Sequence, residues 1–160
     1  DHSRNMFWLG YGQRSDAAAQ RAVEDAFNVE VTPLELADPR FYHMDTALSP
    51  LPRGEVMYLP EAFTAAGIAT IRARVPRSKR IEVGIADAEK LAANAVCLGE
   101  TLLMAGCGER LRETLEERGY RVATTPLRSF LKSGGAAFCL TLRLDRRSQP
   151  ATAIAQAAVA

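Results

Sequence analysis

The sequence has few of the residues from which disulfide frameworks and metal sites are built. Its 160 residues contain three cysteines, Cys97, Cys107 and Cys139, and two histidines, with no Cys-x-x-Cys pair. An odd number of cysteines without paired spacing argues against a disulfide framework and favours a reducing compartment, so we expect a cytoplasmic protein. A zinc site is not expected, because it needs several Cys or His ligands at close spacing.

Long apolar runs and an excess of charge are also missing. The apolar stretches are far shorter than the ~20 residues of a membrane-spanning helix, so no membrane partner is expected. Twenty Lys and Arg residues stand against nineteen Asp and Glu residues, for a formal net charge of +1. Nucleic-acid-binding domains usually carry a clustered basic field, so no nucleic-acid partner is expected. The length suits one compact domain.

What the sequence does contain is a pattern that occurs three times. Each copy begins with a short apolar strand that ends near glycine or proline, continues into a helix and returns through a second and a third strand. The first strands begin at Met6, Glu55 and Thr101. The helices are expected at 15–27, from 60 onward and around 111–115; the second strands at 29–31, 81–83 and 120–122; and the third strands at 43–49, 94–98 and 138–144. Short helices are expected at 87–91 and 129–132.

Three details of the helices follow from the same pattern. Ser15 is the expected N-cap of the first helix, which places Ala19, Ala22, Val23, Ala26 and Phe27 on one face. Gly119 is the expected C′ residue of the third helix. The sequence therefore predicts an α/β fold of repeated strand-helix-strand-strand modules at about 6–51, 54–99 and 100–145, within a domain at 1–145 that a tail at 146–160 follows.

Three such modules in a row form an open arc. Each module leaves sheet edges and apolar helix faces that only a neighbouring module can cover. We therefore expect this chain to belong to a larger unit, and we expect it to self-associate through its exposed edges when it is alone.

The most informative position for function is Cys139. It lies in an alternating run at 138–144, in which Phe138 and the following leucines are expected on a buried face and Cys139 on the polar face of a strand. A cysteine kept for packing should share the leucine face. Ser133, Gly134 and Gly135 precede it, either as a mobile loop over a site or as a tight turn. The placement favours a nucleophile.

A second segment offers partners for that nucleophile. A period of two along the expected strand at 41–50 places His43 and Asp45 on one face. A histidine and a carboxylate can together move a proton and hold a cation; the alternative is a surface or core histidine beside a carboxylate near a turn. Asn94 takes the equivalent strand position in the second repeat, where a side chain that caps neighbouring backbone is the favoured interpretation. Cys97 and Cys107 are interpreted as packing residues.

Three segments, at 41–51, 91–96 and 130–144, resemble the guanidino-group-modifying superfamily, or pentein fold. This superfamily includes arginine deiminases, dimethylarginine dimethylaminohydrolases, arginine dihydrolases and glycine amidinotransferases. The resemblance extends from about Met6 to Leu144 and is greatest to the bacterial dimethylargininase and arginine dihydrolase branch, through Leu-Lys-Ser-Gly-Gly at 131–135. Members have five modules around a channel, so the resemblance implies a partial α/β-propeller with the last three modules of five. An acidic catalytic residue is then expected in the first two modules, outside this chain.

The resemblance also implies residue roles. Cys139 matches the nucleophile, His43 the general acid and base, and Asp45 the carboxylate that contacts the guanidinium, with the segment at 133–135 as substrate-binding residues. The implied reaction is hydrolysis of a C–N bond in arginine or an N-methylated arginine through a covalent amidino-cysteine. It needs a small-molecule guanidine as substrate and no metal or organic cofactor. Two alternatives stay open: amidino transfer to an acceptor amine, and a non-catalytic fragment that serves as a structural or interaction module.

Overall fold

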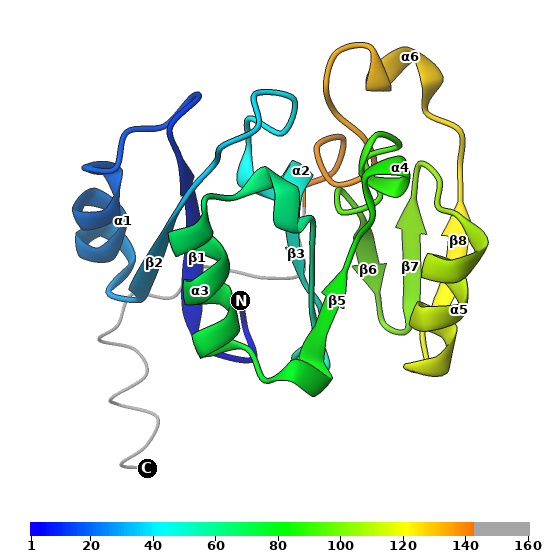
Figure 1. Ribbon diagram of the computed structural model, residues 1–160, viewed down its shortest axis with the longest axis horizontal. Helices are drawn as coiled ribbons and strands as arrows, with labels where there is room; N and C mark the ends of the chain where they lie inside the picture. Colours follow the sequence, from blue (N-terminus) through cyan, green and yellow to red (C-terminus); the bar gives the residue numbers. More distant parts are fainter. Residues whose placement is uncertain (143–160) are drawn as a thin grey trace.

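Three small β-sheets lie side by side in the computed structural model, which describes residues 1–142 (Figure 1). In the first sheet, β1 (Met6–Tyr11) runs parallel to β2 (Glu30–Glu35). In the second, β3 (Leu48–Pro50) is antiparallel to β4 (Val56–Tyr58), which is parallel to β5 (Arg80–Glu82). The third repeats this order with β6 (Val96–Leu98), β7 (Thr101–Met104) and β8 (Arg121–Thr124). The expected α/β fold of strand-helix modules is confirmed.

A helix connects the two parallel strands of each sheet. These helices are α1 (Ala19–Phe27), α3 (Ala65–Arg74) and α5 (Glu109–Glu117). Three short helices, α2 (Met44–Ala47), α4 (Ile85–Ala88) and α6 (Arg128–Leu131), lie in the connections that follow the second strands. Two 3₁₀ turns, η1 (Pro60–Ala62) and η2 (Arg77–Lys79), flank α3. The short helices expected near 87–91 and 129–132 are therefore present.

The strand pairing groups the third strands differently from the sequence repeat. β3 pairs with β4 and β6 pairs with β7, so each of these strands belongs to the sheet of the following repeat. Short connections cause this pairing. Gly99, with a φ of 61°, and Glu100 form a two-residue hairpin loop between β6 and β7. Gly54, with a φ of 87°, turns the chain between β3 and β4, where its N–H donates to the Leu51 carbonyl at 3.0 Å.

Two of the helix ends test the expected caps. The N-cap prediction for Ser15 is wrong: α1 begins at Ala19, after Ala18, because the Asp16 carboxylate accepts from the Ala18 N–H at 2.8 Å in a turn before the helix. The prediction for Gly119 is confirmed. It has a φ of 82°, and the N–H groups of Gly119 and Tyr120 donate to the Glu116 and Leu115 carbonyls, as in a Schellman motif.

One apolar core runs beneath the second and third sheets and reaches the first. Its largest fully buried side chains come from strands, from α3 and α5 and from two connections: Leu34, Phe41, Met57, Tyr58, Leu59, Ile71, Ile81, Leu102, Met104 and Leu115. Helix α1 differs, since none of its residues is buried. Its Phe27 is 49% exposed and packs edge-on against Phe7, with ring centroids 5.3 Å apart. The apolar face expected on this helix is present but largely uncovered.

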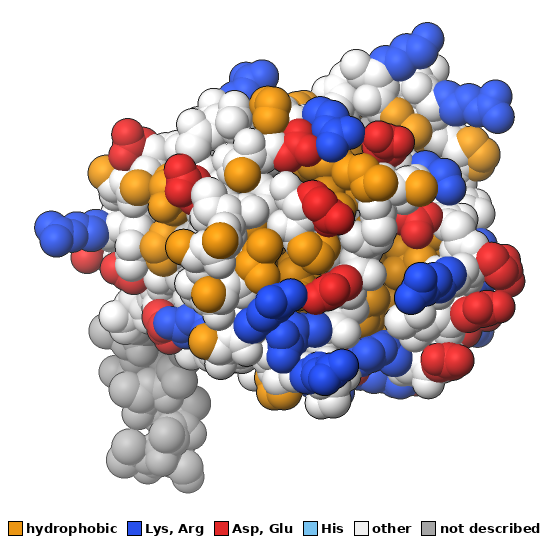
Figure 2. Space-filling model, in the orientation of Figure 1, with side chains coloured by type: hydrophobic (Ala, Val, Ile, Leu, Met, Phe, Trp, Pro, Cys, Tyr) orange, Lys and Arg blue, Asp and Glu red, His pale blue; other side chains and the backbone are white. Residues whose placement is uncertain are grey.

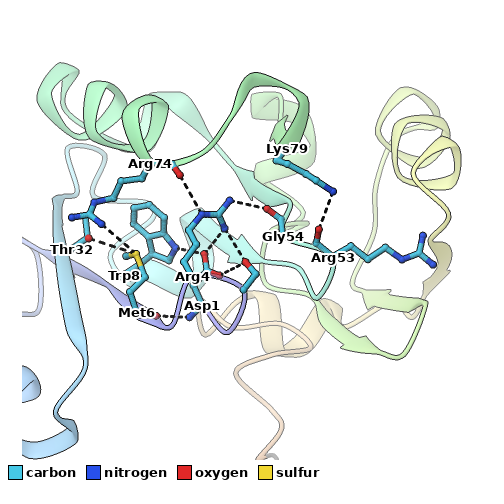
Figure 3. Close-up of polar contacts among 10 residues, drawn as sticks. Asp1, Arg4, Met6, Trp8, Thr32, Arg53, Gly54, Arg74 and Lys79 are labelled. Carbon is cyan, nitrogen blue, oxygen red and sulfur yellow. Dashed lines mark hydrogen bonds and ion pairs between the residues drawn. The ribbon is translucent and has the colours of Figure 1, made fainter.

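Long basic side chains join one sheet to the next (Figure 3). Arg4 donates to the carbonyls of Gly54 at 2.9 Å and of Arg74 at 3.3 Å, which ties the start of β1 to the second sheet. Lys79 donates to the Arg53 carbonyl at 2.9 Å. The Arg53 guanidinium donates to the Arg118 carbonyl at 2.9 Å, in the third sheet's unit. These contacts satisfy backbone groups at the strand and helix ends.

Glu55 is a buried carboxylate at the same junction. Its side chain is 5% exposed, accepts from Lys79 Nζ at 2.8 Å and accepts from the Tyr120 hydroxyl at 2.8 Å. Burial alone would raise the pKa of Glu55, but these two hydrogen bonds and the Lys79 charge outweigh it and lower the pKa. The same contact and burial raise the pKa of Tyr120.

One face of the molecule carries side chains of both charges. Figure 2 shows Lys and Arg side chains interspersed with Asp and Glu, with apolar patches between the elements. Within residues 1–142, no helix has the length and apolarity that crossing a membrane requires.

Candidate active site

The segment that carries His43 and Asp45 is a helical turn and not the expected strand. His43 is the N-cap of α2, Asp45 lies in its first turn, and only Leu48–Pro50 are in a strand. The strand prediction for 43–47 is therefore wrong. Thr46 explains the difference, since its backbone N–H and its hydroxyl both donate to the His43 carbonyl, at 3.1 Å and 2.7 Å. A carbonyl that is bound locally in this way cannot join a strand ladder.

The segment around Cys139 is likewise a turn, and the strand prediction is wrong for the described residues 138–142. The N–H groups of Leu140 and Thr141 donate to the carbonyls of Ala136 and Phe138, as in a helical turn. The expected buried face is exposed instead, with Phe138, Leu140 and Leu142 at 47%, 48% and 84% exposure. Residues 143–145 of the expected strand and module, and the tail at 146–160, lie outside the described residues.

These two turns bring Asp45 to Cys139. The Cys139 Sγ lies 3.1 Å from Asp45 Oδ2, although the two residues are 94 positions apart in the chain. The carboxylate accepts, so the thiol hydrogen points at Asp45. Asn94 is the third member of this contact, because its Nδ2 lies 3.1 Å from both Cys139 Sγ and Asp45 Oδ2.

Asn94 also caps backbone, as expected from its position in the repeat. Its side chain is fully buried, and its Oδ1 accepts from the N–H groups of Ala136 at 3.0 Å and Cys139 at 3.2 Å. Its Nδ2 donates to the Asp45 carbonyl at 3.1 Å. The bond from Cys139 favours a turn here, since a strand ladder would need the Cys139 N–H that Asn94 binds. The sequence did not predict the contact between Asn94 and the sulfur. The one indication was that Asn94 takes the same position in its repeat as the segments that carry His43 and Cys139.

The surroundings of Cys139 favour the neutral thiol. Burial raises its pKa, and the hydrogen bond to Asp45 and the negative charge of that carboxylate raise it further, whereas the hydrogen bond from Asn94 lowers it. A cation placed against Asp45 would neutralise the carboxylate charge that raises the pKa of Cys139. The site is therefore one in which ionisation of the thiol depends on what Asp45 binds.

Ser133, Gly134 and Gly135 form a tight turn that packs against the site. The N–H groups of Gly134 and Gly135 donate to the Leu131 and Phe130 carbonyls at the end of α6. Gly134 has a φ of 78°, and a Cβ at this position would lie 1.9 Å from the Tyr42 Oη. A Cβ on Gly135 would lie 3.1 Å from the Cβ of Cys139. The sequence left open whether residues 133–135 are a mobile loop or a tight turn, and in the structure they are a tight turn.

His43 lies beside this group but does not touch the thiol. Its side chain is exposed, and its ring packs edge-on against Tyr42, with centroids 4.7 Å apart. Among the described residues, no hydrogen bond to its imidazole is formed. Arg14 lies over the other side of this pair, 5.1 Å from the Tyr42 ring centre. The structure thus joins Asp45 to Cys139 and leaves His43 open to solvent at the start of the same short helix.

A cleft of about 520 Å³ opens beside the pair of Asp45 and Cys139. Asp45, Phe138 and Thr141 contribute to its wall at the site, and strands of the first two sheets contribute apolar side chains, among them Phe7, Trp8, Leu48 and Pro50. The site itself offers few metal ligands: within residues 1–142, no group of three or more His, Cys, Asp or Glu side chains is placed to hold a metal ion.

Sequence comparison relates the chain to enzymes of arginine metabolism. No family model matches it. ArgZ of Synechocystis, a bifunctional arginine dihydrolase/ornithine cyclodeaminase, is 42% identical over 150 residues, which are 94% of this chain and 21% of ArgZ. The N(G),N(G)-dimethylarginine dimethylaminohydrolase of Mycobacterium tuberculosis is 36% identical over 135 residues, which are 84% of this chain and 44% of that enzyme.

Solved structures agree with this relationship. The N-terminal domain of ArgZ, as a cysteine-to-serine variant bound to its substrate, superposes with a TM-score of 0.86 at 42% identity, over 88% of this chain and 52% of that one. The same domain covalently bound to a reaction intermediate gives 0.87 at 42% identity, over 91% and 54%. A dimethylarginine dimethylaminohydrolase adduct, at 20% identity, gives 0.67 over 89% and 55%, which shows the fold alone. The chain spans about half the length of these domains.

The fold is built from strand-helix modules, and its candidate site has a cysteine in contact with a carboxylate beside a cleft. These features and the similarities define the class of protein. The chain belongs to the guanidino-group-modifying superfamily, as a homologue of the arginine dihydrolases and of dimethylarginine dimethylaminohydrolase.

Proposed function

We propose that the protein containing this chain hydrolyses the guanidino group of arginine or an N-methylated arginine through a covalent amidino-cysteine on Cys139. The observation that carries this proposal is the 3.1 Å contact between Cys139 Sγ and Asp45 Oδ2 beside the cleft. The pairing suits a guanidinium because the carboxylate can hold two N–H groups of the planar cation while the sulfur faces its carbon. The covalent intermediate found with the related ArgZ domain supports the same chemistry.

In the first step, the substrate activates its own nucleophile. A guanidinium bound to Asp45 neutralises the charge that raises the pKa of Cys139, so the thiol loses its proton to water as the substrate settles. The thiolate then attacks the guanidino carbon and forms a tetrahedral adduct. Asp45 serves here as the substrate clamp, and the turn at 133–135 confines the sulfur on the other side.

In the second step, His43 handles the protons. It donates one to the departing nitrogen, so that ammonia or a methylamine leaves and an amidino-cysteine remains. Neutral His43 then takes a proton from water, the hydroxide attacks the amidino carbon, and the C–S bond breaks to release citrulline and the thiolate. This role requires a histidine that exchanges protons with water, and exposed His43 at the N-cap of the Asp45 helix meets that requirement.

We further propose that residues 1–145 form part of a five-module propeller. Two features support the presence of neighbouring modules. Helix α1 has no buried residue, and the first sheet has two strands where the other two sheets have three. Such modules would supply a second acidic residue and the groups that bind the amino-acid end of the substrate. Residues 146–160 are proposed as a tail outside this domain.

The test uses the complete protein and measures ammonia release from arginine and dimethylamine release from N(G),N(G)-dimethylarginine, with no acceptor amine present. Cys139→Ser should abolish turnover because a hydroxyl is too weakly ionised to replace the thiolate. Cys107→Ser, a change at a half-buried thiol beside the core, is the matched control and should retain it. Turnover by Cys139→Ser would refute the proposal. Turnover by the parent only after an amine is added would identify a transferase.

A further inference from the structure

The geometry points to Asn94 as a positioning residue of this site, an inference that rests on the proposed function: its amide holds the Cys139 sulfur against the Asp45 carboxylate and supplies a hydrogen-bond donor to the thiolate. Asn94 contacts Asp45 but does not itself line the cleft. It lies behind both groups, in the connection between α4 and β6.

The orientation of the amide follows from its partners. Two backbone N–H groups, of Ala136 at 3.0 Å and Cys139 at 3.2 Å, meet one end of the side chain, and only an oxygen can accept from both. The NH₂ group must therefore occupy the other end. There it faces the Asp45 carbonyl, the Asp45 carboxylate and the Cys139 sulfur, each at 3.1 Å.

The amide nitrogen, the sulfur and the carboxylate oxygen form a triangle with sides of 3.1 Å each. With the thiol protonated, the S–H donates to Asp45 and the amide donates to both. When the proton leaves, the sulfur can only accept, and the Asn94 N–H is then its donor among the described side chains. Without that donor, the Ala136 backbone N–H would be the remaining hydrogen bond among the described residues that favours the thiolate against the Asp45 carboxylate.

Asn94 is itself held rigidly. It is fully buried, its own N–H donates to the Leu91 carbonyl at 3.0 Å, and its carbonyl accepts from the Phe138 N–H at 3.2 Å. One residue thus binds the Cys139 turn through three bonds to backbone and one to sulfur, and it binds the Asp45 helix through two more. The position of the nucleophile relative to the substrate clamp depends on this single side chain.

Asn94→Asp tests the donor with little change in shape. The carboxylate keeps an oxygen for Ala136 and Cys139 but removes the N–H donor and places a second negative charge beside the sulfur. Asp45 is the charged side chain in contact with the thiol, and His43 at the start of the same helix does not touch it. We expect the midpoint of Cys139 alkylation by iodoacetamide, followed by peptide mass in the complete protein without substrate, to rise by about one pH unit or more. Asn28→Asp, at the exposed end of α1, is the matched control and should leave the midpoint unchanged.

A charge swap separates positioning from mere support of the fold. In Asn94→Asp combined with Asp45→Asn, one amide and one carboxylate again flank the sulfur, so the alkylation midpoint should return toward that of the parent. If Asn94→Asp does not fold, Asn94→Ala removes the donor without adding charge and should raise the midpoint by a smaller amount. An unchanged midpoint in a folded variant of either kind overturns the inference. Because no substrate is used, a shifted midpoint in a protein that never hydrolyses arginine would reject the proposed function and retain this inference.

Discussion

At the scale of single residues, the site is built around one thiol whose ionisation is opposed by burial and by the neighbouring Asp45 carboxylate. Asp45 raises the pKa of Cys139, yet the same carboxylate is the group best placed to hold a guanidinium. The two effects are connected, since binding of the cation cancels the charge that protects the thiol. In the proposed reaction, Cys139 would stay protonated and less reactive until the substrate binds.

Replacing Asp45 and replacing His43 should therefore change different kinetic constants of the complete protein. Asp45→Asn should raise the KM for arginine about tenfold or more, because a charged clamp is lost, and should lower the pH at which free Cys139 is alkylated. His43→Ala should leave KM nearly unchanged and lower kcat about a hundredfold or more, the usual scale of a lost general acid and base. Steady-state kinetics and the alkylation profile separate the two, and equal, mild effects from both variants would contradict the assigned roles.

At the scale of secondary-structure elements, short turns rather than strands present the reactive groups. Helix α2, the connection before β6 and the turn after α6 each supply one member of the triangle, and the sheets beneath them fix where these connections end. The turn after α6 depends on glycine, because its backbone has a positive φ next to Tyr42.

Gly134→Ala should destabilise this turn and disturb the site together. The left-handed backbone costs a non-glycine residue about 1–2 kcal/mol, and the added methyl group would collide with Tyr42. We expect lower thermal stability and a large loss of turnover. Gly106→Ala is the matched control, since the nearest atom to its added Cβ would be 3.5 Å away on the Lys90 side chain. Equal melting temperatures for the two variants would show that the turn tolerates a side chain.

The junction between the second and third sheets should confer a pH dependence on folding. Because the pKa of Glu55 is lowered in the folded protein, its contribution to stability is complete above the ordinary glutamate pKa and is lost as the pH falls through the folded pKa. Glu55→Gln should cost about 1–3 kcal/mol at neutral pH, through bonds weakened to Lys79 and Tyr120. The cost should shrink as the pH falls below the ordinary glutamate pKa of about 4.3, because the advantage of the ionised carboxylate is lost between that value and its lowered folded pKa.

Urea denaturation at pH 7 and at pH 3.5 measures this difference. Glu116→Gln is the control, since this residue forms an exposed pair with Arg112 on α5 and should cost less than about 0.5 kcal/mol. A Glu55→Gln penalty that stays constant from pH 7 to pH 3.5 would mean that ionisation of this carboxylate does not stabilise the junction.

At the scale of the whole molecule, the described residues form a row of sheets with uncovered apolar groups. Phe27 on α1, Leu98 at the end of β6 and Leu142 after the cysteine turn are all largely exposed. In Figure 1 the first and third sheets lie at the two ends of the row. Exposed apolar groups and open strand edges recruit other chains.

The 160-residue chain expressed alone should therefore self-associate and should not hydrolyse guanidines detectably. Light scattering after size-exclusion chromatography measures the first property, and an ammonia-release assay measures the second. The complete protein should be monodisperse and active under the same conditions. A monomeric 160-residue chain that turns over arginine would refute the proposed requirement for further modules.

The order of elements was readable from the sequence because it depends on local patterns. Apolar runs that end at Gly10, Pro60 and Gly106 predicted the positions of β1, β4 and β7. Gly119 predicted the end of α5, because its positive φ is a local conformational requirement. The alternation at 138–142 failed because period-two hydrophobicity predicts a strand only where a partner strand binds its N–H groups. Here Asn94 binds the first two of them, that of Phe138 through its backbone carbonyl and that of Cys139 through its side chain.

By itself, the sequence determined the α/β class, the three repeats and the choice of Cys139, His43 and Asp45 as candidates, because composition, spacing and family resemblance all act within short segments. Tertiary structure alone decided which residues meet. It paired β3 and β6 with the following repeats, joined Cys139 to Asp45 across 94 positions and placed Asn94 behind both. Contacts of this kind depend on how three sheets pack around one core, and no local pattern encodes the distance between two turns.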